Sequence, residues 1–329
     1  MIYDLILVSV QTYIEILYKT IHLQFYSYNK GILLMDRFKK VIKIVSISAI
    51  VLIAIITFLF LFDVLWKSPS FYKVETETKL NKPIMDMVEY EEIIAVHRRP
   101  YCYSIESKSG GKVYVLGIEH TKDAENSQFD TINRIWNEAD PTTALVEGRI
   151  GFLFTWFQNP ITEYGESGLT AELAKEKGIK LYTWEPTRDD EIKSLIKKYS
   201  AEQLAMFYSF RPYFSNMRFG KPANPEEQLQ SYLESRTDTK HLRGVIKSWY
   251  ELDSLWNKDY PNINWRDYSD EYGWPEGYLS SIANESNLYR DYHLVQIINE
   301  LVKKGERVFV TMGSSHAPRI ESTLRDLLE

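Results

Sequence analysis

Two hydrophobic patterns divide this chain of 329 residues into an apolar N-terminal part and a longer part in which strands and helices alternate. Residues 44–62 are apolar apart from three small hydroxyl residues. A helix that continues from there to Trp66 is long enough to cross the hydrocarbon core of a bilayer, which is roughly 30 Å thick. We therefore predict a transmembrane helix over residues 44–66.

Charged residues in front of this apolar run indicate its orientation. Four basic residues precede it, at Arg37, Lys39, Lys40 and Lys43. The positive-inside rule then places the N-terminus in the cytoplasm and the C-terminal domain on the extracytoplasmic side of the cell membrane, as in a single-pass protein. An uncleaved anchor is favoured over a cleaved signal peptide, because the run is long and no small-x-small cleavage site follows it.

Residues 1–43 form a short N-terminal segment. The first 34 residues are apolar and aromatic, with helical fragments predicted at Leu5–Val10 and Ile14–Tyr18. These fragments are too short for a second membrane span. Met35 and the basic residues after it are typical of the start of a signal anchor, so we hypothesise that translation begins there. A peptide from residues 1–34 in the mature protein would contradict this hypothesis.

Residues 70–329 are predicted to form one α/β domain, which is large enough to bury a sizeable core. Runs of β-branched and aromatic residues predict strands, and apolar residues at helical spacing lie between them. The predicted strands are Tyr101–Ile105, Val113–Leu116, Thr143–Val146 and Ile179–Trp184. The first two form a hairpin. The β-α-β-α-β order that follows implies a mainly parallel sheet with right-handed crossovers and flanking helices.

The middle of the domain, about residues 188–283, is predicted to be a helical insertion. Its last part, Asn257–Ser281, is polar, rich in turns and aromatic. Such a segment is typical of a lid over a cleft or of a surface that binds a sugar or a peptide, and a stabilised surface loop has the same composition. The pattern then predicts a helix from about Asn287 to Lys304 and a final helix over Arg319–Leu328.

A strand that ends in Gly-x-x-His occurs twice, about two hundred residues apart. The copies are Lys112-Val-Tyr-Val-Leu-Gly-Ile-Glu-His120 and Arg307-Val-Phe-Val-Thr-Met-Gly-Ser-Ser-His316. Glycine at the end of a buried strand allows a sharp turn or the close approach of another group. Open α/β sheets bind ligands at the carboxyl ends of their strands. The chain has only six histidines, so this internal pseudo-repeat favours a paired site at His120 and His316.

Composition argues against three classes of protein. The formal net charge is −6 and the isoelectric point is about 5.7. Such an acidic balance argues against a general nucleic-acid binder, which needs a basic face. Cys102 is the only cysteine, which excludes an intramolecular disulfide and a cysteine-based zinc finger.

Four segments resemble the Tiki/TraB (TraB-PrgY-GumN) superfamily, which also takes in erythromycin-esterase and haem-binding ChaN-like proteins. Within about residues 112–328, they are Gly117–His120, Leu145–Arg149, Arg290–Leu294 and Gly313–His316. The resemblance implies an α/β fold with an internal duplication, in a membrane-anchored protein with an external domain. Members similar to Tiki are metal-dependent proteases that need both Gly-x-x-His motifs and a glutamate, whereas others are esterases or haem binders. This chain differs in having Glu119 inside the first motif and Asp291 where some members carry asparagine.

These residues favour a metal-dependent hydrolase, either peptidase-like or esterase-like. His120, His316 and Glu147 would bind one divalent ion, and two imidazoles with a carboxylate suit Zn²⁺, Mn²⁺, Fe²⁺ or Co²⁺. Such an ion lowers the pKa of bound water from 15.7 toward about 7. Glu119 is the alternative carboxylate ligand. The glutamate that does not bind the ion is the candidate general base.

Arg149 and Arg290 are candidates for stabilising the oxyanion or for holding a carboxylate of the substrate, an unidentified peptide or ester. Two other functions remain open. In a metal-independent esterase, one histidine activates water and a glutamate orients that histidine. In a non-enzymatic module, the histidines bind haem, a metal or another ligand. This function stays open because a fold and its motifs do not determine the chemistry.

Overall fold

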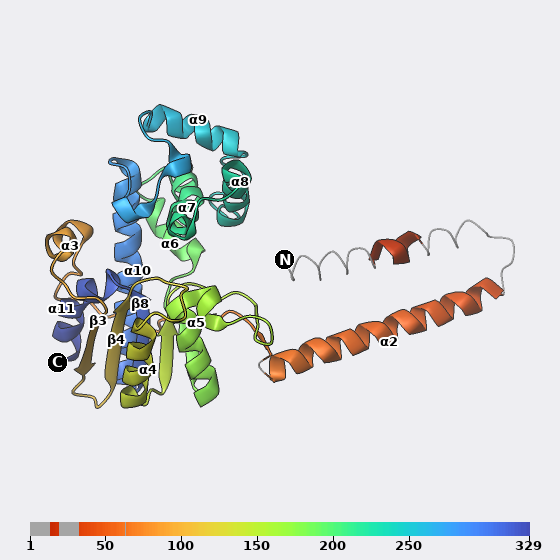
Figure 1. The fold of residues 1–329 in the computed structure, drawn as a ribbon, viewed down its shortest axis with the longest axis horizontal. Coiled ribbons are helices and arrows are strands. Elements are labelled where there is room, and N and C mark those ends of the chain that lie inside the picture. The colour runs from red at the N-terminus through yellow and green to blue at the C-terminus, as the bar shows by residue number, and fades with distance from the viewer. Residues whose placement is uncertain (1–13, 20–32, 63) are drawn as a thin grey trace. The chain divides into compact units, whose positions relative to one another are not determined.

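The computed structural model of the chain separates into two compact units, Met1–Trp66 and Lys67–Glu329. Within them the structure describes residues 14–19, 33–62 and 64–329, without the side chains of residues 33–37 and 272 (Figure 1). The predicted helical fragment Leu5–Val10 lies outside the described residues, whereas residues 14–19 are helical. The start of translation at Met35 stays a prediction.

The N-terminal unit contains the long helix α2 (Leu33–Leu61), which is followed by the two-residue strand β1 (Leu65–Trp66). Among the described helices, only α2 is long and apolar enough to cross a membrane, over Phe38–Leu61, with a mean hydropathy of 3.0. The helix lies nearer the N-terminus than the predicted limits of 44–66, because lysine and arginine are good helix formers and the basic flank continues the helix. Its orientation in a membrane stays a prediction.

A six-stranded sheet forms the centre of the C-terminal unit (Figure 1). All neighbouring strands are parallel except β3, which forms an antiparallel hairpin with β4 at one edge. In sheet order the strands are β2 (Ser70–Phe71), β7 (Lys180–Thr183), β5 (Thr143–Val146), β8 (Arg307–Gly313), β4 (Lys112–Ile118) and β3 (Tyr101–Glu106). The predicted α/β class with a mainly parallel sheet is confirmed. The short strand β6 (Leu153–Phe154) lies outside this sheet.

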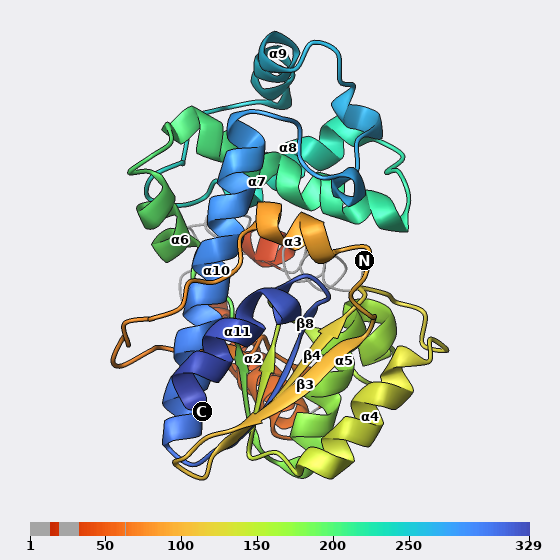
Figure 2. The ribbon, with the colours of Figure 1, turned by 90° about the vertical axis from the view of Figure 1, so that its left-hand side faces the viewer.

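Helices cover both faces of the sheet, as Figure 2 shows. Side chains along a strand point to alternate faces, so each strand contributes to two cores. Val115 packs with the helices on one face and the next residue, Leu116, packs with those on the other. The first pair of helices is α10 (Tyr278–Lys303) and α11 (His316–Leu328), and the second pair is α4 (Gln128–Ala139) and α5 (Pro160–Lys177).

The two strands that end in Gly-x-x-His are neighbours in the sheet. β4 and β8 pair in parallel along their whole length, with Lys112 opposite Arg307 and Ile118 opposite Gly313. Their carboxyl ends therefore lie at the same edge of the sheet. The internal pseudo-repeat as such stays a prediction, since pairing in register is a property of two strands and not of two duplicated units.

The predicted insertion forms a helical lobe beside the sheet (Figure 2). Its helices are α6 (Arg188–Leu195), α7 (Ala201–Asn216), α8 (Pro225–Arg236) and α9 (Trp249–Asp259), with 3₁₀ turns at Met217–Phe219, Trp265–Asp267 and Asp270–Tyr272. α10 begins at Tyr278, earlier than the predicted Asn287, because Leu279 and Ile282 continue the apolar spacing and pack into the lobe core. The later turns of α10 pack on the sheet, so one helix joins the two layers. The short helix α3 (Met87–Ile93) precedes the sheet hairpin.

The aromatic segment Asn257–Ser281 packs into the same lobe. Tyr260 and Trp265 are buried in its core, and the indole N–H of Trp265 donates to Asp253 at 2.8 Å. These two rings are therefore structural and are not available to bind a sugar or a peptide. For the segment as a whole, a lid over a cleft and a stabilised surface loop both stay open as predictions.

Candidate functional site

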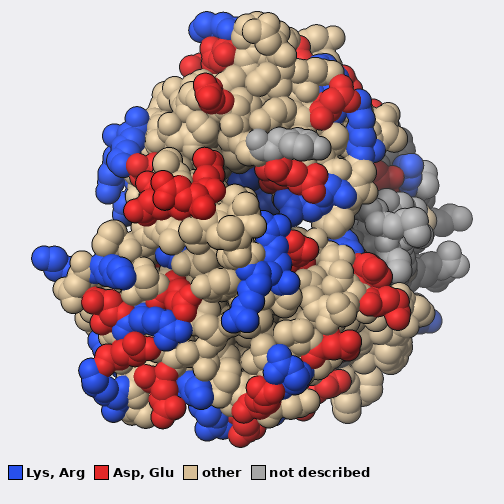
Figure 3. Space-filling model, turned by 60° about the vertical axis from the view of Figure 1, so that its left-hand side comes forward, with Lys and Arg blue, Asp and Glu red and all other residues tan. Residues whose placement is uncertain are grey.

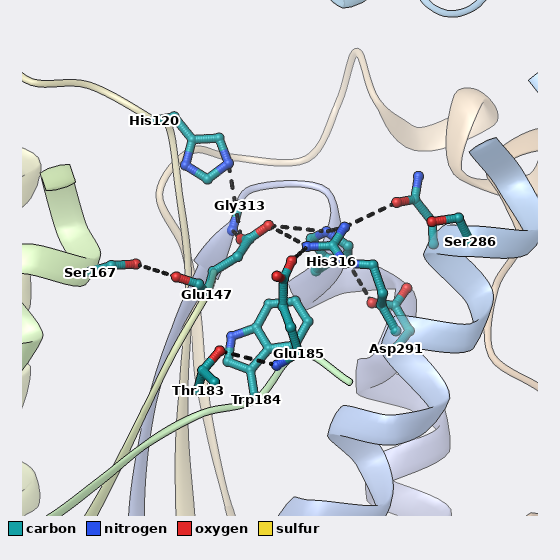
Figure 4. A network of polar contacts seen from close by, with 12 residues as sticks. His120, Glu147, Ser167, Thr183, Trp184, Glu185, Ser286, Asp291, Gly313 and His316 are labelled. Carbon is teal, nitrogen blue, oxygen red and sulfur yellow. Dashed lines mark hydrogen bonds and ion pairs between the residues drawn. The ribbon is translucent and has the colours of Figure 1, made fainter. Parts of the chain in front are cut away.

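Four strand ends converge at one edge of the sheet. His120 follows β4, Glu147 follows β5 and Glu185 follows β7, while His316 begins α11 just beyond β8. Figure 4 shows the side chains of His120, Glu185 and His316 around that of Glu147. Parallel strands bring their carboxyl ends together, and this edge is where open α/β sheets bind ligands.

Glu147 lies between the two histidines. One carboxylate oxygen, Oε2, accepts a hydrogen bond from the backbone N–H of Gly313 at 2.6 Å and lies 4.0 Å from Nε2 of His120. The other oxygen, Oε1, accepts from Arg290 at 2.7 Å and lies 3.8 Å from Nε2 of His316. Glu147 therefore contacts both predicted histidines through different oxygens.

His120 is held from behind by Glu166, a residue of α5. Nδ1 of His120 lies 2.6 Å from the carboxylate of Glu166, which is buried, whereas 36% of the His120 side chain is exposed. A break in α5 positions Glu166: the preceding residue, Gly165, has φ +56° and ψ −134°. A side chain at Gly165 would approach the carbonyl oxygen of Thr121 to 2.6 Å, so both the conformation and the space require glycine.

His316 is held by Asp291 in the core of the unit. Nδ1 of His316 lies 2.5 Å from Asp291, and the other oxygen of Asp291 pairs with Arg319 at 2.9 Å. The side chains of Asp291 and Arg319 are fully buried and only 6% of His316 is exposed. The rings of Trp184 and His316 pack edge to face, with their centroids 5.4 Å apart. His316 is therefore rigid and largely shielded from solvent.

Arg290 places a positive charge in the middle of this group. Its guanidinium pairs with Glu147 and Glu185, and one terminal nitrogen lies 3.4 Å from Nε2 of His316. The same guanidinium lies over the ring of Trp184, 5.2 Å from its centroid. Because only 4% of the side chain is exposed, the charge needs these two carboxylates to offset its desolvation.

The charges of the group shift the titration of its members. Burial acts to raise the pKa of Glu147, but electrostatic interactions with His316 and Arg290 outweigh it and hold that pKa well below its usual range. For His120, burial acts to lower the pKa, but Glu166 and Glu147 outweigh it and raise the pKa to about 9. Burial also opposes the charge of Arg290, and the carboxylates around it raise its pKa above the usual value.

The surroundings of Gly313 explain why the second motif has glycine at this position. A β-carbon there would lie 2.9 Å from Nε2 of His120 and 3.4 Å from a carboxylate oxygen of Glu147. The backbone of β8 can therefore approach the first histidine only without a side chain. At Gly117 of the first motif, a β-carbon would lie 2.7 Å from that of Ala317, so this glycine lets α11 pack against β4.

Two cavities reach the group. The first, about 370 Å³, is lined by His120, Glu147 and Arg290 together with Arg149. The exposed Arg149 guanidinium lies 5.4 Å from the ring centroid of Phe71, so Arg149 is at the cavity wall and outside the network around Glu147. The second cavity, about 760 Å³, reaches both histidines. Its basic lining residues are Arg99, Lys122 and Arg218, and Figure 3 shows basic side chains at the hollow in the middle of one face.

Glu119 does not join the group, although the sequence suggests it as a ligand or general base. Its carboxylate pairs with Arg99 at 3.1 Å and its side chain is 57% exposed. Its backbone N–H donates to Gln128 at 3.1 Å, which fixes the turn after β4. Glu119 nevertheless lines the 760 Å³ cavity that reaches both histidines, so its role as a ligand or general base stays a prediction.

Sequence reasoning missed Glu166 and Glu185. Glu185 lies beyond β7 as Glu147 lies beyond β5. The rule that ligands bind at the carboxyl ends of parallel strands, applied to β7, would therefore have identified Glu185. The signal for Glu166 is weaker: it lies in Gly165-Glu-Ser-Gly168, and two glycines inside a helical pattern indicate a close backbone approach. At Gly168 a β-carbon would lie 2.0 Å from the carbonyl oxygen of Pro160.

Three of these side chains could hold a metal ion. His120, Glu147 and Glu166 each offer one ligand atom, and the three atoms lie within 4.8 Å of one another. Nitrogen and carboxylate ligands of this kind suit Zn²⁺, Mn²⁺, Fe²⁺ or Co²⁺. His316, a predicted ligand, lies outside this set of three. Comparison of the chain with protein-family models, curated proteins and solved structures finds no match in any of the three.

Proposed function

We propose that this protein is a membrane-anchored hydrolase of peptides or esters, with its reaction centre at the carboxylate of Glu147. The observation that carries the proposal is that Nε2 of His120 and Nε2 of His316 face different oxygens of this one carboxylate, at 4.0 and 3.8 Å. Two imidazoles and a carboxylate that meet in a cavity at strand ends are typical of hydrolytic sites.

The carboxylates behind the rings determine which ring nitrogen is available for chemistry. A carboxylate only accepts hydrogen bonds, so Nδ1–H of His120 donates to Glu166 and Nδ1–H of His316 donates to Asp291. Nε2 of each ring is then directed at Glu147. The same arrangement orients histidines that bind catalytic metals and histidines that act as general bases.

The donor set fits a divalent cation, and this is the first version of the proposal. Nε2 of His120 and an oxygen of Glu147 would hold the ion, with Glu166 orienting His120. When bound, such an ion supplies a water molecule whose pKa falls from 15.7 toward about 7. Gly313 and Arg290 fix the two oxygens of Glu147 by hydrogen bonds, so its carboxylate is already oriented before a ligand arrives.

The position of Arg290 favours a second version, which needs no metal. Its guanidinium already supplies positive charge between Glu147 and His316. In this version Nε2 of His316 accepts a proton from the attacking water. The proton on Nε2 of His120, whose pKa is raised to about 9, passes to the leaving group. Arg149 at the cavity wall remains the candidate for holding the oxyanion.

Membership of the Tiki/TraB superfamily and an extracytoplasmic position of the domain belong to the same proposal. The neighbouring Gly-x-x-His strands β4 and β8, with Glu147 between their histidines, support the first. A helix of membrane-spanning length preceded by basic residues supports the second. Reporter fusions at the C-terminus test the orientation, since alkaline phosphatase is active only outside the cytoplasm.

Metal content and turnover measured together test the proposal. Full-length protein in detergent is analysed by plasma mass spectrometry and screened against ester and peptide panels, beside His120→Ala, His316→Ala and the control His241→Ala. We expect turnover to fall at least 100-fold in the first two variants and to stay within about twofold in the control. Full activity of His120→Ala would overturn both versions, and full activity of His316→Ala would overturn the version without a metal.

A chelator separates the two versions. Activity that is lost with a strong chelator and returns with zinc supports the metal-dependent version, whereas activity that survives supports the version in which His316 is the general base. Bound metal or haem without turnover of any substrate would instead indicate a binding module.

A further inference from the structure

A third cavity adjoins the candidate centre and is lined by four arginines. It measures about 630 Å³, and we call it the arginine cavity after its basic residues, Arg149, Arg188, Arg211 and Arg236. It shares Arg149, Glu185 and Arg211 with the 370 Å³ cavity that contains His120 and Glu147. A molecule bound at the candidate centre can therefore extend into it.

The four arginines come from four different parts of the fold. Arg149 follows β5, Arg188 begins α6, Arg211 lies in α7 and Arg236 ends α8. Tertiary packing alone brings them together. Arg188 is fixed in place, because one of its terminal nitrogens donates to the backbone carbonyl oxygen of Ser235 at 2.9 Å. That carbonyl lies in the last turn of α8, where cations are favoured.

These guanidinium groups have few carboxylate partners. Among the described residues, no carboxylate oxygen lies within ion-pair distance of Arg236, and the nearest one to Arg211, from Glu191, is 3.9 Å away. Burial, together with the charge of Arg236, lowers the pKa of Arg188. Burial and the charge of Arg211 likewise lower the pKa of Arg236. The like charges are close enough to destabilise one another.

The acidic residues that line the same cavity are mostly engaged elsewhere. Glu185 pairs with Arg290, and Asp238 pairs with Arg243 at 2.6 Å. Glu191 accepts a hydrogen bond from the hydroxyl of Ser286, and its charge offsets that of Arg211 alone, 3.9 Å away. Asp189, the remaining one, is exposed at the start of α6. The arginine cavity therefore keeps an excess of positive charge.

A buried hydroxyl in the cavity wall lacks a partner. Thr239 lines the arginine cavity, only 6% of it is exposed, and its side-chain oxygen has no hydrogen-bond partner among the described residues. An unsatisfied buried hydroxyl is costly and is usually paired with protein, water or ligand. The hydroxyl of Tyr208, also buried, lies in the same wall beside Glu191.

We propose that the arginine cavity binds an oxyanion group of the substrate, either a phosphate or a carboxylate, and that the hydrolase therefore acts on anionic molecules. The identification of the bound molecule as a substrate rests on the proposed function, whereas the anion-binding site does not. Guanidinium groups donate paired hydrogen bonds that match the oxygens of both groups. Arg211 and Arg236 would be the main anion ligands, and the hydroxyl of Thr239 would donate to one of the anion oxygens.

Calorimetric titration of the full-length protein in detergent tests the site directly. Inorganic phosphate is one probe and malonate is the other, so that the two sources of the oxyanion are told apart. We expect at least one of them to bind, and about tenfold more weakly to Arg236→Gln, since a charged hydrogen bond is lost. Arg134→Gln, which removes an exposed arginine of α4 whose partner Glu138 does not line the cavity, serves as the matched control and should bind as the wild type does.

Three results would overturn the inference. They are the absence of binding of both anions, equal binding by wild type and Arg236→Gln, and equal weakening in the Arg134→Gln control. If Arg236→Gln does not fold, as judged by its circular dichroism and melting temperature, Arg236→Lys replaces it. Arg236→Lys keeps the charge but loses the paired donors, so it should bind more weakly than wild type.

The site and the proposed function can fail separately. His120→Ala should bind phosphate or malonate as the wild type does, because His120 does not line the arginine cavity. Anion binding without turnover of any substrate would contradict the proposed hydrolase and support the anion site. Turnover of neutral and anionic esters with equal KM, and with the same KM in Arg236→Gln, would support the hydrolase and contradict the anion site.

Discussion

The two Gly-x-x-His motifs have the same sequence pattern and lie on neighbouring strands, yet their histidines are in different environments. His120 lies in a loop, keeps 36% of its side chain exposed, and pairs with Glu166. His316 begins a helix, is 6% exposed, and pairs with Asp291, which in turn pairs with Arg319. Both nevertheless direct Nε2 at Glu147. One motif therefore gives an exposed histidine and the other a histidine that is held tightly by buried neighbours.

Because of this difference, we expect substitutions beside His120 to affect ligand binding and substitutions beside His316 to affect the stability of the protein. A ligand in the 370 Å³ cavity can reach His120 directly, and water can solvate that ring when its partner is removed. The His316 ring instead packs against Trp184 and the buried Asp291. A substitution there leaves a charge in the core without compensation.

Replacing Glu147 should have the largest effect, because it is the one group that both histidines share. Glu147→Gln keeps the shape but loses the negative charge that faces His120, His316 and Arg290. We expect turnover to fall about 1000-fold, within the range for removal of an acid–base group. The check is kcat on a substrate from the panel, with circular dichroism to verify the fold. A loss smaller than tenfold would remove Glu147 from the centre of the site.

Asp291→Ala should lower the stability of the protein more than the equivalent change beside His120. Removing one partner of a buried ion pair costs about 3–5 kcal/mol, since Arg319 would be left charged in the core. Glu166→Ala, the equivalent change on the exposed side, should cost only about 1 kcal/mol. Urea unfolding followed by tryptophan fluorescence measures both. Equal losses would show that the two motifs do not differ in the way described.

Glu166→Gln should act on ligand binding instead of stability. It keeps a hydrogen-bond acceptor for Nδ1 of His120 but removes the charge that supports the ring. For a carboxylate behind a metal-binding histidine, the expected loss of metal affinity is about 10- to 100-fold. Zinc titration with a competing chelator measures it, and the melting temperature should stay near that of the wild type. Unchanged zinc affinity would favour the version without a metal.

The titration of His120 gives a smaller, charge-based test. Its pKa is raised to about 9 from the ordinary 6.5, so in the metal-free protein its stabilising charge is fully present below pH 6.5. That contribution is lost as the pH rises through 9. NMR titration of the ring should show a midpoint near 9 in the chelated protein and a lower midpoint in Glu166→Gln. A wild-type midpoint at 6.5 would argue against the pairing with Glu166.

Glu119→Gln should have the smallest effect, although Glu119 is next to His120 in the sequence. Its ion pair with Arg99 is at the surface, where such pairs contribute about 0–1 kcal/mol. Turnover and zinc affinity should therefore stay within about twofold of the wild type, measured in the same assays. A large loss would return Glu119 to the list of catalytic groups and overturn its placement outside the site.

Much of the site could be predicted from the sequence, because strand ends can be read from local patterns. Alternating valine and aromatic residues place β4 and β8, and the β-α-β-α-β order makes the strands parallel. His120, Glu147 and His316 then have to lie at one edge. The apolar run before the domain predicts a helix of membrane-spanning length by composition alone.

Only the tertiary structure decided which neighbours these residues have. Glu166 reaches His120 through the break at Gly165, and a break of this kind depends on contacts with Thr121 and not on helical periodicity. Arg290 points to Glu147 because α10 is packed against the sheet, whereas Glu119 turns to Arg99. The arginine cavity forms from four separated elements. Local spacing fixes the face on which a side chain lies, but long-range packing fixes what that side chain meets.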